Sequence, residues 1–146
     1  MDMTTRRTAW LLGLAGLLPF AGAALAFFAA PDSWRGFAEG ALIAYGAVIL
    51  SFLGAVHWGL ALRAPVEEAP MGPARLTLGV LPALISWVAL LLPDVFALPL
   101  LALGILGTAG LEQWARGRGL VPGDYLLLRW VLSVGAALCL MAPITG

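Results

Sequence analysis

Long apolar runs separated by short polar connections dominate the pattern of hydrophobic and polar positions along this chain. At about 1.5 Å of rise per residue, five of these runs are long enough to cross a hydrocarbon layer of about 30 Å as helices. We therefore expect five transmembrane helices, at about residues 9–30, 38–62, 74–92, 95–114 and 121–142. The sequence predicts an all-α integral membrane protein whose residues 1–146 form a single five-helix bundle.

Two of the predicted helices contain a proline near the middle of the span. Pro19 in the first helix and Pro82 in the third each remove a backbone hydrogen bond, so we expect a kink at each. The tetrapeptides that end at these prolines, GLLP and GVLP, are similar, and each helix is followed by a Pro-Asp pair. Either chance or an internal repeat explains this similarity. A repeat would give two parallel-repeat hairpins, helices 1-2 and 3-4, plus a fifth helix.

Small side chains recur on one face of the predicted second helix. At about 100° per residue, one sector contains Gly40, Ala44, Ala47, Ser51, Gly54 and Trp58. Small residues let another helix backbone approach closely, so we expect this face to be packed against a neighbour. On the fourth helix, Gly104, Thr108 and Glu112 recur at intervals of four and predict a second packed face.

Composition supports the membrane assignment and narrows the possible partners. Hydrophobic residues make up 62% of the chain and charged residues 11%, which leaves too little polar surface for a water-soluble globule. The expected surroundings are therefore a lipid bilayer. The formal net charge is zero, so no strong field favours nucleic acid. One histidine and the lone Cys139 cannot build a metal site within one chain, and no metal is predicted.

Arginines are distributed unevenly between the two ends of the predicted bundle. One side receives Arg6, Arg7, Arg63, Arg75, Arg116 and Arg118, whereas the other side receives only Arg35. Cytoplasmic loops of membrane proteins carry an excess of basic residues. We therefore expect a multi-pass protein whose amino terminus is cytoplasmic, or on the matrix side in an organelle, and whose carboxy terminus is outside.

Three ionisable side chains fall at similar depth inside the predicted spans, namely His57, Glu112 and Arg129, each within roughly 6 to 11 Å of its helix end. Ionisable groups in a bilayer usually face the bundle interior. One hypothesis is a polar pocket, completed by Trp58 and Tyr125, that holds a lipid head group, a quinone or a small carboxylate. The other is a structural clamp in which Arg129 pairs with Glu112 or extends to the interface, and His57 bonds a carbonyl.

Sequence patterns of known enzyme classes are largely missing. The sequence contains no paired carboxylates at helix spacing, no nucleophile elbow and no glycine-rich phosphate loop. No catalytic residue and no cofactor are predicted, and a noncatalytic protein is favoured over an enzyme. A haem on His57 would need a second ligand from a partner chain. A bound lipid or quinone remains open.

Five segments form a recognisable combination: residues 44–46 (AYG), 52–59 (FLGAVHWG), 16–20 (GLLPF), 81–82 (LP) and 119–129 (GLVPGDYLLLR). With these segments the chain resembles, over nearly its whole length, the transmembrane protein 69-like family, the bacterial and mitochondrial domain of unknown function 3429. The resemblance implies a small protein of the bacterial inner (plasma) membrane without an established activity. The resemblance also implies that His57, Trp58 and Arg129 have a role in the protein and are not chance occurrences.

Three functions are compatible with these observations. The first is a noncatalytic accessory or assembly partner of a larger membrane complex, associated with other membrane proteins or with copies of itself. The second is a lipid, quinone or small-molecule binding protein or transporter that uses the layer of His57, Glu112 and Arg129. The third, and least favoured, is a membrane enzyme that acts on an isoprenoid or lipid.

Overall fold

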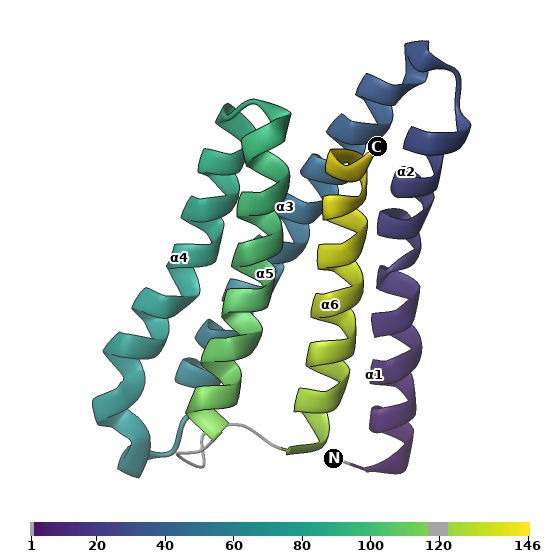
Figure 1. Cartoon of the computed structure of the whole chain (residues 1–146). Coiled ribbons are helices and arrows are strands. Elements are labelled where there is room, and N and C mark those ends of the chain that lie inside the picture. The colour runs from purple at the N-terminus through teal and green to yellow at the C-terminus, as the bar shows by residue number, and fades with distance from the viewer. Residues whose placement is uncertain (1, 117–122) are drawn as a thin grey trace.

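The computed structural model describes residues 2–116 and 123–146, and these residues form helices joined by short connections, without a strand. In chain order the elements are α1 (Met3–Gly16), α2 (Leu18–Ala29), α3 (Asp32–Leu62), the 3-10 helix η1 (Val66–Met71), α4 (Gly72–Leu91), α5 (Asp94–Arg116) and α6 (Gly123–Thr145) (Figure 1). Within the described residues, five spans are long and apolar enough to cross a membrane, with α1 and α2 together forming the first. The predicted all-α, five-span membrane fold is confirmed.

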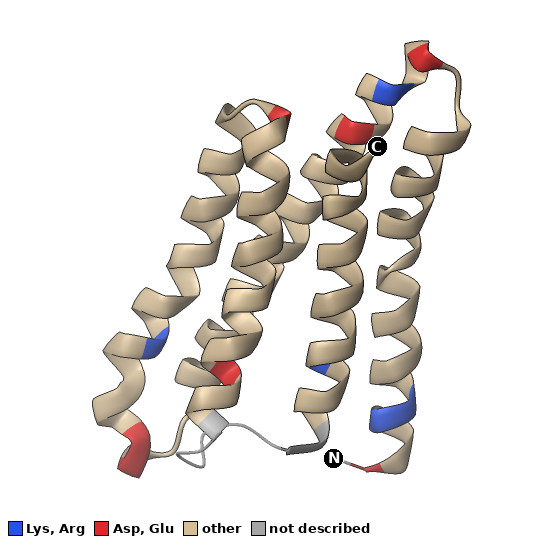
Figure 2. Cartoon of the chain, in the orientation of Figure 1, with Lys and Arg blue, Asp and Glu red and all other residues tan. Residues whose placement is uncertain are grey.

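Polar residues extend several helices beyond the apolar runs that predicted them. The first helix begins at Met3 rather than residue 9, because the Asp2 carboxylate accepts a hydrogen bond from the Thr5 backbone N–H at 2.6 Å and caps it. The second span begins at Asp32 rather than residue 38, and Asp32 pairs with Arg35 one turn later at 3.2 Å. Figure 2 shows that the charged positions gather toward the two ends of the bundle.

The remaining boundaries differ less from the predicted ones. The connection before the third span contains η1, and α4 then begins at Gly72 rather than residue 74. The fourth and fifth helices extend to Arg116 and Thr145 rather than residues 114 and 142. The predicted start of the last helix, residue 121, lies outside the described residues, as does Arg118 from the arginine count.

Helix α3 lies at the centre of the bundle, where it contacts α2, α4, α5 and α6. Its buried side chains meet those of α5 and α6 in one core, which includes Leu42, Leu50, Leu98, Leu101 and Leu140. Large apolar side chains also cover the outside of the helices, as expected for a surface in contact with lipid. The amino and carboxy termini lie at opposite ends of the bundle, as an odd number of spans requires (Figure 1).

The first span is broken at Leu17, just before Pro19. Proline has no N–H to offer the carbonyl four residues earlier, and α2 restarts with Pro19 in its first turn. The Tyr45 hydroxyl of α3 donates a 2.9 Å hydrogen bond to the Gly16 carbonyl at this break.

In contrast to the first span, α4 continues through Pro82. The two similar tetrapeptides therefore have different structures, and the hairpin repeat is not established by the fold.

Replacing Tyr45 by phenylalanine is expected to destabilise the protein by about 1 kcal/mol, because it removes the hydrogen bond to the Gly16 carbonyl and keeps the ring. The measurement is the free energy of unfolding in mixed micelles. Ser51→Ala is the matched control on α3, because the Ser51 hydroxyl bonds only the Ala47 carbonyl of its own helix, at 2.9 Å. Equal effects of the two replacements would show that the Tyr45 bond does not support the break.

The predicted small-residue face of α3 is packed over only part of its length. A Cβ atom on Gly54 would overlap the carbonyl oxygen of Gly79, so α3 and α4 cross with their backbones close together at this point. Ala47 is buried, whereas Ala44 is exposed and Gly40 faces open space. The prediction is corrected for these last two residues, because α3 and α4 separate beyond the crossing (Figure 1).

Candidate functional site

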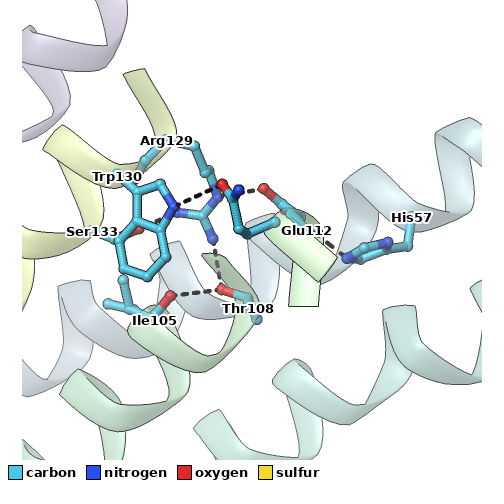
Figure 3. Close-up of polar contacts among 8 residues, drawn as sticks. His57, Ile105, Thr108, Glu112, Arg129, Trp130 and Ser133 are labelled. Atoms are coloured by element: carbon cyan, nitrogen blue, oxygen red, sulfur yellow. Dashed lines mark hydrogen bonds and ion pairs between the residues drawn. The ribbon is translucent and has the colours of Figure 1, made fainter. Parts of the chain in front are cut away.

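A buried ion pair between α5 and α6 forms the centre of the candidate site. The Arg129 Nε donates to Glu112 Oε2 at 3.0 Å (Figure 3). Only 3% of the Arg129 side chain and 2% of the Glu112 side chain are exposed. Two full charges are stable at such a position only when they are paired and further hydrogen-bonded. The pair therefore ties the two helices together at one depth.

Two hydroxyl groups complete the guanidinium's surroundings. Arg129 Nη1 donates to Ser133 Oγ at 2.6 Å, and Nη2 donates to Thr108 Oγ1 at 2.6 Å. Each hydroxyl gives its own proton to a carbonyl of its own helix, Ser133 to Arg129 at 2.7 Å and Thr108 to Ile105 at 2.8 Å. Their remaining lone pairs can therefore accept from the cation. Three of the five guanidinium N–H groups are used in this way, which leaves two without a partner among the described residues.

The second carboxylate oxygen of Glu112 faces α3. The Oε1 atom is buried and has no hydrogen-bond partner among the described residues, and it lies 4.0 Å from Nε2 of His57. His57 itself is 8% exposed, so it points into the bundle rather than toward lipid (Figure 3). His57, Glu112 and Arg129 thus lie in one layer, which we call the polar layer. The separation of 4.0 Å is longer than a hydrogen bond.

Of the other two predicted site residues, Tyr125 lies beside the polar layer and Trp58 does not. Tyr125 is half-buried and lies one turn before Arg129 on the same face of α6. Trp58 is not part of the polar layer: it is 44% exposed, and its indole N–H donates to the Leu76 carbonyl of α4 at 3.0 Å. Trp58 therefore belongs to the crossing of α3 and α4, where its ring lies against Gly79.

Arg75 and Ser133 are polar residues of this region that sequence reasoning did not select. Arg75 was counted only as a loop cation, but it is 8% exposed and pairs with Glu68 of η1 at 2.8 Å. The helical pattern could have identified Ser133, because it follows Arg129 by one turn on the same face of α6.

Two cavities lie beside the polar layer. The first, which we call the α1–α6 cavity, has a volume of about 430 Å³ and is lined mainly by apolar residues of α1, α2, α3 and α6, with Tyr125 and Arg129 in its wall. The second has a volume of about 390 Å³, lies between α4 and α5, and reaches His57 and Thr108. Side chains of the polar layer therefore form part of the walls of both cavities, Arg129 in the first and His57 in the second.

The arrangement suits binding and hydrogen bonding better than covalent chemistry. Arg129 is a permanent cation and cannot take or give a proton, and its charge is balanced by Glu112. What the site offers to a ligand in the α1–α6 cavity is the free guanidinium N–H groups and the Tyr125 hydroxyl, which makes no hydrogen bond with another described residue. These are donors in an otherwise apolar wall.

Together, the fold and the polar layer define a multi-pass helical membrane protein with a buried ionic contact. The chain belongs to the family described as "Protein of unknown function (DUF3429)", whose model matches residues 5–145. It is 44% identical over 90 residues to transmembrane protein 69 of Xenopus tropicalis. That match covers 60% of this chain and 34% of the relative, so the chain spans about a third of the relative's length. No solved structure matches the chain.

Proposed function

We propose that the chain is a noncatalytic membrane protein that binds an uncharged, lipid-like molecule, such as a quinone or a glycerolipid, in the α1–α6 cavity. The observation that carries this proposal is a cavity of about 430 Å³, within the size range of small-molecule sites, whose apolar wall contains Tyr125 and Arg129. An apolar tail would fill the cavity, and the polar end of the molecule would lie next to these two side chains.

Charge balance favours an uncharged ligand over an anion. Glu112 already neutralises Arg129, and bringing a second negative charge next to this pair in an apolar environment would cost free energy. A carbonyl or ester oxygen needs only hydrogen-bond donors. The two unused N–H groups of Arg129 and the Tyr125 hydroxyl supply such donors without changing the charge.

Removing the Tyr125 hydroxyl and filling the cavity test this proposal separately. Tyr125→Phe is expected to lower the amount of co-purified quinone or lipid several-fold, because one donor is lost while the aromatic ring remains. Ala9→Phe is expected to remove the ligand almost entirely, because Ala9 lines the α1–α6 cavity. The measurement is mass spectrometry of solvent extracts from protein purified in mild detergent, with ligand expressed per protein.

The matched control is Ala83→Phe, because Ala83 is exposed on α4 and lines neither of the two cavities beside the polar layer. This variant is expected to retain the wild-type amount of ligand. If Ala9→Phe and Tyr125→Phe also retain it, the binding function is rejected and the polar layer is only a structural clamp.

A second candidate function is an accessory or assembly partner of a larger membrane complex. The observation that favours it is a set of glycines on membrane-spanning helices that face open space, Gly22, Gly40, Gly59, Gly107 and Gly110. Small residues at such positions let a helix of another chain approach closely. Native gels of the protein's own membrane are expected to show a complex larger than the monomer, and free monomer alone would exclude this role.

We also propose that the protein lies in a bacterial inner membrane with its amino terminus in the cytoplasm. The support is the six-to-one bias of arginines toward the end of the bundle that carries the amino terminus. Labelling single cysteines introduced at Thr4 and at Thr145 with a membrane-impermeant reagent tests the orientation. Only the cysteine at residue 145 is expected to react in intact cells.

A further inference from the structure

An arginine-rich pocket lies at the membrane-water end of α1, away from the polar layer. It has a volume of about 660 Å³ and is lined by Arg6, Arg7, Trp10 and Leu11 of α1 and by Leu127 of α6. Both arginines are exposed, and neither forms an ion pair with another described residue. We call this pocket the α1 basic pocket. In Figure 2 its charge is the blue band near the amino-terminal end of α1.

The residues of the pocket follow one another from charged to apolar along α1. Arg7, Trp10 and Leu11 are separated by three and four residues, so they share one face of the helix. Leu11 and Leu127 are 71% and 65% exposed, and they continue the pocket toward the hydrocarbon region. Guanidinium groups, then an amphipathic indole ring, then exposed leucines match the sequence of phosphate, glycerol and acyl chain in a phospholipid.

We propose that the α1 basic pocket binds the head group of an anionic phospholipid. Arg6 and Arg7 bind the phosphate, for which the planar guanidinium has suitable donors. Trp10 lies at the glycerol level, and Leu11 and Leu127 contact the first part of an acyl chain. This site differs from the α1–α6 cavity, because its lining residues are different and because no described acidic residue forms an ion pair with Arg6 or Arg7.

Asp2 is the described acidic residue nearest to these arginines in the chain, and it opposes the lipid. The carboxylate caps α1 through the Thr5 N–H, and this hydrogen bond holds the pKa of Asp2 below its ordinary value. Asp2 is therefore ionised at neutral pH, four residues before Arg6 on the same helix face. Asparagine caps helices about as well as aspartate, so Asp2→Asn removes the charge and keeps the cap.

The test uses the full chain in a neutral detergent, titrated with phosphatidylglycerol and, separately, with phosphatidylcholine. Native mass spectrometry counts the lipid molecules retained by each protein. Phosphatidylglycerol is expected to bind more tightly than phosphatidylcholine. Arg6→Gln and Arg7→Gln are each expected to weaken its binding by roughly fivefold, the effect typical of one arginine near an anionic surface. Asp2→Asn is expected to strengthen binding.

Two further variants separate a specific site from general charge attraction. Arg63→Gln removes an exposed arginine that does not line the pocket, and it is expected to change binding by less than about twofold. The double replacement of Arg6 and Arg7 by lysine keeps the charge but loses the planar donors of the guanidinium, and it is expected to bind phosphatidylglycerol more weakly than the wild type. An equal loss in Arg63→Gln, or a lysine variant that binds as tightly as the wild type, would overturn the proposal.

Inorganic phosphate distinguishes a lipid from a free anion as the source of the bound group. A large excess of phosphate is expected to leave the retained phosphatidylglycerol unchanged, because phosphate lacks the acyl chain that Leu11 and Leu127 contact. Displacement of the lipid by phosphate, or equal binding of phosphatidylcholine, would show that the pocket is not a site for an anionic phospholipid.

Discussion

Replacing Glu112 by leucine is expected to destabilise the bundle by about 3 to 5 kcal/mol, the range observed when one partner of a buried ion pair is removed. Arg129 would then keep a buried positive charge whose remaining hydrogen-bond partners among the described residues are the neutral hydroxyls of Thr108 and Ser133. Arginine cannot lose its proton to escape this cost. The measurement is the free energy of unfolding in mixed micelles, where helical membrane proteins unfold reversibly enough for comparison.

The converse replacement, Arg129→Met, is expected to cost less than Glu112→Leu. A carboxylate that loses its counter-charge can take up a proton and become neutral, whereas a guanidinium cannot. Glu67→Leu is the control, because Glu67 is exposed on η1, and it is expected to change stability by less than about 0.5 kcal/mol. A larger cost for Arg129→Met than for Glu112→Leu would contradict this explanation of the buried pair.

Replacing Gly54 by alanine is expected to have the next largest effect, a loss of about 1 to 3 kcal/mol. The added methyl group would overlap the backbone carbonyl oxygen of Gly79 and approach the ring of Pro82. A side chain can rotate away from such a clash, but a helix backbone cannot. The two helices would therefore have to move apart along the crossing, and the hydrogen bond from Trp58 to Leu76 would be strained with them.

Gly59→Ala is the matched control on the same helix, because a Cβ atom at Gly59 would meet nothing within 4 Å. This replacement is expected to leave stability unchanged or to raise it by up to about 1 kcal/mol, since alanine is the better helix former. If Gly54→Ala is tolerated as well as Gly59→Ala in unfolding measurements, α3 and α4 do not cross as closely as described.

Features that are determined by residues close together in the sequence could be predicted from the sequence. Apolar length alone located the five spans, and the missing N–H of Pro19 indicated where the first span would be irregular. The positions of Glu112 and Arg129 at similar depth, with Glu112 on a small-residue face, suggested the contact that the structure shows. Pairing inside the bundle was one of the two expected ways for Arg129 to avoid lipid, the other being extension to the interface.

Features that depend on how helices rotate and cross could not be read in the same way. Trp58 and Gly54 share a face of α3, but only the close crossing with α4 determines that Gly54 is buried and that Trp58 bonds a neighbouring carbonyl. The same crossing leaves Gly40 unpacked. Arg75 pairs with Glu68 because η1 runs directly into α4 as one helical span from Val66 to Leu91, an arrangement that the prolines of this connection did not reveal.

The contact between Tyr45 and the break in the first span is also nonlocal. A tyrosine in an apolar run gives no indication of its partner, which lies 29 residues earlier in the chain. The Tyr45 hydroxyl donates to a carbonyl at the position where proline interrupts the helix. The fold therefore explains both the polar group in the apolar run and the carbonyl that the break would otherwise leave unbonded.

The most direct test of the central claim, that Glu112 and Arg129 are energetically coupled inside the bundle, is a double-mutant cycle. It compares the unfolding free energies of the wild type, Glu112→Leu, Arg129→Met and the combined variant in the same micelles. The combined variant is expected to be more stable than Glu112→Leu alone, with a coupling energy of about 2 kcal/mol or more, because no buried charge remains. Additive losses, with a coupling energy near zero, would contradict the account.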